Sequence, residues 1–127
     1  MSGAGRLTTH VLDTARGRPA AGVAIELVLL ELVGGGSGPA DGTVARAVTN
    51  ADGRTDAPLI PPGALVAAVY ELHFAVGAYF ASSSEAAVGS PPFLDLIPVR
   101  FAIADPDADY HVPLLVSPWA YSTYRGS

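Results

Sequence analysis

Short segments in which apolar and polar residues alternate with a period of two recur along almost the whole chain. The clearest example spans residues 66–76, where one face carries Ala68, Tyr70, Leu72 and Phe74. Successive side chains of a strand point to opposite faces of a sheet, so this period predicts strands with one buried face. The same pattern predicts six further strands, over residues 7–12, 23–30, 43–49, 97–103, 110–116 and 120–124.

The connections between these segments are rich in glycine and proline. The 127 residues include 14 glycines and 11 prolines, which disfavours long helices and favours short elements joined by turns. Turns are predicted at residues 50–53, 105–107 and 117–118, and a flexible hairpin loop at residues 34–38. The one helical signal is the capping-box spacing of Ser82 and Glu85, which predicts a short helix there. We expect a single all-β domain over residues 1–127, a two-sheet β-sandwich of seven to eight strands with one short helix.

Charge and cysteine content exclude several classes of function. The net charge is −5 and no basic cluster appears, so no nucleic-acid partner is expected. With no cysteine, the chain has neither disulfides nor thiolate chemistry. Residues 1–6 lack the apolar core of a signal peptide, and the apolar run over residues 23–33 contains Glu26 and Glu31 and is too short for a bilayer. A cytoplasmic protein that does not enter the membrane is expected.

The last two predicted strands are apolar or aromatic on both faces. They span residues 110–116 (Tyr-His-Val-Pro-Leu-Leu-Val) and 120–124 (Ala-Tyr-Ser-Thr-Tyr). One domain of this size cannot cover both faces of a sheet, and another subunit is the simplest cover. The pattern therefore predicts an oligomer.

Three histidines and two arginines are the groups that could carry chemistry. A single strand histidine such as His10 is more often packed or surface-exposed than catalytic, and His73 shares its face with Glu71, which favours a surface role. His111 differs because it lies in an apolar run, where an imidazole is costly unless it is hydrogen-bonded. Arg54 follows a turn and reads equally well as a loop charge, and Arg125 lies in the terminal tail. No nucleophile elbow, zinc motif or phosphate-binding loop is present.

Four segments resemble a known family in order and over nearly the whole chain. They are residues 7–20 (Leu-Thr-Thr-His-Val-Leu-Asp, then Gly-Arg-Pro-Ala), residues 49–54 (Thr-Asn-Ala-Asp-Gly-Arg), Tyr79-Phe80, and residues 110–127, which end in Tyr-Arg-Gly-Ser. Together they are similar to the 5-hydroxyisourate hydrolase branch of the transthyretin-like family. The histidine at 111 and the terminal tetrapeptide distinguish this branch from the hormone carriers.

The resemblance implies hydrolysis of 5-hydroxyisourate to 2-oxo-4-hydroxy-4-carboxy-5-ureidoimidazoline in urate degradation, without a metal or organic cofactor. It assigns catalysis to His10, Arg54 and His111, and substrate contacts to the tail residues Tyr124, Arg125 and Ser127. It also implies a homotetramer, a dimer of dimers with active sites at the dimer–dimer interface.

Some questions stay open at this stage. Asp109 stands where many relatives have a histidine, and either His10 or His111 could be the general base. A non-catalytic carrier of small aromatic ligands on the same fold and a generic β-sandwich interaction module are the alternatives.

Overall fold

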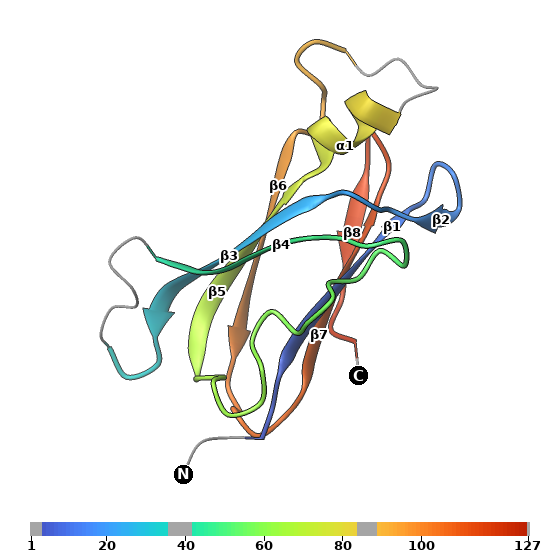
Figure 1. The fold of residues 1–127 in the computed structure, drawn as a ribbon. Helices are drawn as coiled ribbons and strands as arrows, with labels where there is room; N and C mark the ends of the chain where they lie inside the picture. Colours follow the sequence, from blue (N-terminus) through green and yellow to red (C-terminus); the bar gives the residue numbers. More distant parts are fainter. Residues whose placement is uncertain (1–3, 36–41, 84–88, 127) are drawn as a thin grey trace.

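Two four-stranded sheets pack against each other across one core (Figure 1). The computed structural model describes residues 4–35, 42–83 and 89–126. Sheet A has the strand order β2-β1-β7-β8, formed by Arg18–Pro19, Leu7–Asp13, Tyr110–Val116 and Tyr121–Thr123. Sheet B has the order β4-β3-β5-β6, formed by Thr43–Val48, Ala24–Leu32, Ala68–Ala75 and Leu96–Ile103. Within these described residues, the eight strands and helix α1 (Val76–Ser83) confirm the predicted sandwich of seven to eight strands with one short helix.

The alternation in the sequence is the alternation of burial in the structure. In β5 every second residue from Ala68 to Phe74 is buried, as predicted, and the residues between are half-buried. β1 shows the same pattern, with Leu7, Thr9 and Val11 buried beneath the sheet. Full burial of a large aliphatic or aromatic side chain stabilises the fold by about 1.5–3 kcal/mol. The core therefore fixes which faces of the strands point outward.

A parallel pairing of β1 with β7 joins the two ends of the sequence. Thr8 lies opposite His111 and His10 lies opposite Pro113 in this register. The buried hydroxyl of Thr9 donates to the carbonyl oxygen of Val112 at 2.7 Å, which adds a side-chain bond to the ladder. Residues about a hundred positions apart thus share the outer face of sheet A.

The helix lies earlier in the chain than the sequence signal placed it. α1 follows β5 directly, and Ser82 lies in its last turn rather than at its start. The Ser82 hydroxyl donates to the carbonyl oxygen of Tyr79 at 3.0 Å. The predicted capping box was therefore wrong at Ser82, and Glu85 lies outside the described residues. The buried aromatic pair Tyr79 and Phe80, packed edge to face, determines where the helix forms.

Aromatic side chains near β8 are uncovered in the single chain. Trp119, Tyr121 and Tyr124 are 61%, 46% and 60% exposed.

Within residues 4–35, 42–83 and 89–126, no helix has the length and apolarity needed to cross a bilayer. The predicted flexible loop at residues 34–38 lies largely outside the described residues, which include only Gly34 and Gly35 of it.

Candidate active site

A glycine turn places Arg54 beside His10. The side-chain oxygen of Asn50 accepts the backbone N–H groups of Asp52 and Arg54, at 2.9 and 3.3 Å. Gly53 has a φ of 73°, and its carbonyl oxygen accepts the N–H of Val11 at 2.8 Å. A Cβ atom at Gly53 would collide with the Val11 carbonyl oxygen. Only glycine lets this turn approach β1 closely enough to form the backbone bridge between His10 and Arg54.

His111 is held on three sides. The hydroxyl of Thr8 lies 2.8 Å from its Nδ1. The backbone N–H of Gly126 donates to the His111 carbonyl oxygen at 2.7 Å. A Cβ atom at Gly126 would lie 2.7 Å from Cδ2 of the imidazole, so the tail packs directly on the ring. On the third side the ring of His10 lies nearly parallel, at 22°, with the centroids 6.2 Å apart.

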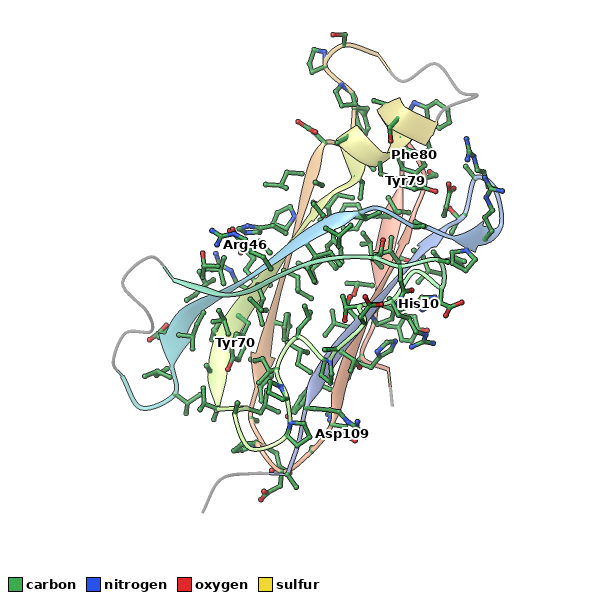
Figure 2. The ribbon with its side chains drawn as sticks, in the orientation of Figure 1. His10, Arg46, Tyr70, Tyr79, Phe80 and Asp109 are labelled. Atoms are coloured by element: carbon green, nitrogen blue, oxygen red, sulfur yellow. The ribbon has the colours of Figure 1, made fainter. Side chains whose placement is uncertain are left out.

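Thr8, Arg54 and His111 line a polar cavity on the outer face of sheet A. The cavity has a volume of about 320 Å³ and is lined by Arg6, Thr8, Arg54, Asp109, Tyr110 and His111. His10 lies beside Arg54 and His111 on the same face, which Figure 2 shows turned away from sheet B. The three residues that the resemblance assigned to catalysis are therefore brought together.

Both imidazoles of this site favour their neutral form. Burial lowers the pKa of His10 below its ordinary value of 6.5, and the charge of Arg54 lowers it further. Burial also lowers the pKa of His111, with added contributions from Arg54 and His10. No carboxylate ion pair with either ring is formed within the described residues. A neutral imidazole can accept a proton near neutral pH, which general-base catalysis requires.

The tail residues contact a different cavity of the same chain. Tyr124 and Arg125 line a hollow of about 360 Å³ between the edge of β6 and strands β7 and β8. The guanidinium of Arg125 lies 4.1 Å from the ring centre of Tyr110, which borders both cavities. In the single chain Tyr124 and Arg125 line this hollow and not the cavity at His111, and Ser127 lies outside the described residues.

Four further lining residues were not predicted as site residues: Arg6, Thr8, Asp109 and Tyr110. Thr8 lies two positions before His10 and so on the same strand face, but its role depends on the β1–β7 register, which the sequence does not reveal. Arg6 and Asp109 approach each other at 3.8 Å on the cavity rim. Asp109 also accepts the backbone N–H of Arg6 at 3.2 Å.

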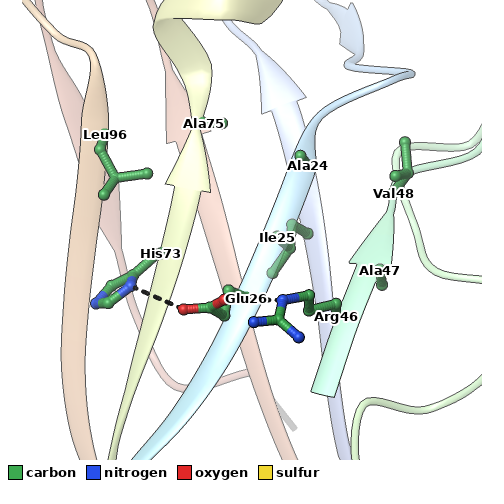
Figure 3. Close-up of a pocket in the computed structure, with 9 residues that line it drawn as sticks. All are labelled: Ala24, Ile25, Glu26, Arg46, Ala47, Val48, His73, Ala75 and Leu96. Atoms are coloured by element: carbon green, nitrogen blue, oxygen red, sulfur yellow. Dashed lines mark hydrogen bonds and ion pairs between the residues drawn. The ribbon is translucent and has the colours of Figure 1, made fainter. Parts of the chain in front are cut away.

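A larger cavity lies on the opposite face of the molecule. It occupies about 510 Å³ on the outer face of sheet B, where Glu26 lies between Arg46 and His73 (Figure 3). His73 is bound to Glu71 at 2.7 Å. The surface role expected for His73 agrees with these contacts. Among the described residues, no three His, Cys, Asp or Glu side chains gather as a metal site would require.

The protein is thus a two-sheet β-sandwich that carries two imidazoles and one guanidinium on one outer face. Residues 7–126 match the HIUase/Transthyretin family, and the chain belongs to it.

Curated relatives and solved structures match this chain over nearly its full length. The chain is 54% identical to a 5-hydroxyisourate hydrolase of Deinococcus radiodurans, covering all of both proteins. A crystal structure titled (S)-allantoin synthase matches 99% of this chain with a TM-score of 0.88 and 47% identity, and this chain spans 45% of that one. The 5-hydroxyisourate hydrolase of Klebsiella pneumoniae matches with a TM-score of 0.75 and 33% identity, covering 97% of this chain and 99% of that one.

Proposed function

We propose that this chain hydrolyses 5-hydroxyisourate, opening its six-membered ring to give 2-oxo-4-hydroxy-4-carboxy-5-ureidoimidazoline. The observation that carries the proposal is the convergence of His10, Arg54 and His111 on one outer face of sheet A. Full-length relatives named 5-hydroxyisourate hydrolase support it.

The chemistry needs a base, an anion-stabilising group and a proton donor. One neutral imidazole takes a proton from water, and the hydroxide oxygen forms a bond to the ring carbonyl carbon. Negative charge then develops on the carbonyl oxygen, where the fixed donors of Arg54 stabilise it. The carbon–nitrogen bond breaks as the departing nitrogen receives a proton from an imidazole. One water is consumed, and its second proton leaves the new carboxyl group.

Assembly into a tetramer would cover the exposed aromatic side chains and bring the tail residues to an active site between subunits. The exposed aromatic side chains of Trp119, Tyr121 and Tyr124 favour cover by another subunit. A dimer of dimers that places its active sites between subunits would let Tyr124, Arg125 and Ser127 of the tail contact substrate across an interface. Sedimentation at micromolar concentration tests this part, and a monomer would contradict it.

The decisive experiment follows the absorbance of freshly made 5-hydroxyisourate with and without the protein. The proposal predicts decay much faster than the spontaneous rate, and a rate equal to that in buffer would contradict it. A non-catalytic carrier would bind the ligand without accelerating its decay. A variant lacking residues 124–127 is expected to lose activity, and full activity there would remove the tail from the site.

A further inference from the structure

We propose that Thr8 is a positioning residue that donates its hydroxyl proton to Nδ1 of His111 and so keeps the proton of this imidazole on Nε2. The inference rests on the proposed function and deepens it. It makes His111 the group that delivers a proton to the departing nitrogen and leaves His10 as the base that activates water.

The geometry around His111 leaves one edge of the ring available. Thr8 contacts Nδ1 at 2.8 Å, and Gly126 covers the Cδ2 edge. What remains is the edge formed by Cε1 and Nε2. Nε2 makes no hydrogen bond within residues 4–35, 42–83 and 89–126, and His111 lines the 320 Å³ cavity. The nitrogen presented to a ligand is therefore Nε2.

The direction of the hydrogen bond sets the role of that nitrogen. Neutral imidazole carries one proton, so a hydroxyl that donates to Nδ1 requires the proton to be on Nε2. In the opposite direction the hydroxyl proton of Thr8 would need another acceptor, and the described residues provide none. Its proton would then depend on solvent in the cavity, which the half-buried Thr8 side chain contacts only in part, whereas donation to Nδ1 satisfies it within the chain. Thr8 therefore favours the Nε2–H form of His111.

The backbone keeps this arrangement fixed. Thr8 and His111 are paired residues of the parallel β1–β7 ladder, so their side chains emerge on the same face. The bond between Gly126 N–H and the His111 carbonyl holds the tail against the ring. A ring rotated by 180° would place Cδ2 against the Thr8 hydroxyl and lose the bond. The loss of the Thr8 bond opposes that rotation.

Three variants test the proposal kinetically. Thr8→Val keeps the shape and the strand preference but removes the hydroxyl, and is expected to lower kcat about tenfold with KM changed less than twofold. Thr8→Ser restores the hydroxyl and is expected to recover at least half of the parent kcat. Thr14→Val, at an exposed position outside the cavity, is the matched control and should equal the parent. A folded Thr8→Val protein with the parent kcat would overturn the proposal.

Nitrogen-15 NMR of the imidazoles provides the second readout, which a merely structural role would not move. At pH 7.5 the parent is expected to show His111 with its proton on Nε2, and Thr8→Val a mixture of tautomers. A proton on Nδ1 in the parent would overturn the proposal. If the parent failed to hydrolyse 5-hydroxyisourate while the tautomer was as expected, the proposed function would fail and the hydrogen-bond direction would stand.

Discussion

The outer faces of the two sheets both carry histidine, but their electrostatic surroundings are opposite. On sheet B, His73 contacts Glu71 at 2.7 Å and approaches Glu26 at 3.9 Å. On sheet A, burial lowers the pKa values of His10 and His111, and the charge of Arg54 lowers both further. The cavity on sheet B is the larger of the two. The difference shows that the burial of an imidazole and the charge beside it, rather than the size of a cavity, indicate where a neutral base is held.

The charged side chains and the histidine on the outer face of sheet B contact one another. A ladder of charges crosses all four of its strands, from Arg46 through Glu26, His73 and Glu71 to Arg100. The hydrogen bond from His73, followed by the contacts of Arg100, lowers the pKa of Glu71. Exposed pairs of this kind contribute about 0.2–1 kcal/mol each. The ladder stabilises sheet B, and within it His73 contacts the carboxylates of Glu71 and Glu26.

Substitutions on the outer face of sheet A are expected to lower activity far more than a substitution on the outer face of sheet B. We expect His111→Ala and Arg54→Ala each to lower kcat/KM for 5-hydroxyisourate by about 10²–10³, because a proton donor or an oxyanion donor is lost. His73→Ala is the matched change on sheet B and should stay within about twofold of the parent. A folded His111→Ala protein with the parent rate, or a His73→Ala protein as impaired as His111→Ala, would break the comparison.

A smaller effect, on the free energy of unfolding, is expected from substituting the glycine in the turn that precedes Arg54. Gly53 and Gly17 have similar φ values, 73° and 67°, but only Gly53 has backbone where a Cβ would be placed. Gly17→Ala is expected to lower the free energy of unfolding by about 1 kcal/mol, and Gly53→Ala by about 2–4 kcal/mol. Urea denaturation measures both. Equal losses would show that the close approach to β1 is not what requires glycine.

The pH dependence follows from the lowered pKa values of His10 and His111. The neutral rings are the active forms, so kcat/KM is expected to hold down to pH 6.5 and to fall only at lower pH. Arg54→Met removes one cause of the lowering, and the acid limb of its residual activity should move to higher pH. The unfolded chain takes up protons at 6.5 while the folded site resists them, so the free energy of unfolding should also fall below pH 6.5. An acid limb that does not move would remove Arg54 from the site's electrostatics.

The smallest effect is on the charge ladder. Glu71→Gln is expected to reduce stability by about 1 kcal/mol or less and to leave kcat/KM unchanged. Because the pKa of Glu71 is lowered, its contribution is present above pH 4.5 and is lost as the pH falls through the lower folded-state value. Thermal unfolding at pH 7 and pH 3 measures the difference between the variant and the parent. An equal difference at both values would contradict this account of sheet B.

The strands were predictable because burial follows a period of two, as β1 and β5 show. The helix was misplaced because local capping chemistry at Ser82 was weaker than the burial of two aromatic residues, Tyr79 and Phe80, in the middle of α1. His10, Arg54 and His111 were proposed as site residues from resemblance alone, since their proximity depends on a parallel pairing and a turn that composition does not encode. Thr8 could not be found, because only the register places it against His111.

A crystal structure of the protein with bound urate would test directly whether the active site lies on the outer face of sheet A. Urate keeps the fused rings of 5-hydroxyisourate but lacks the centre that makes it labile, so it should remain intact. We predict that it lies on the outer face of sheet A, with its oxygens toward Arg54 and a ring edge toward His10 and His111. Urate bound instead in the cavity of Glu26 and His73 on sheet B, with the sheet A site empty, would contradict the account.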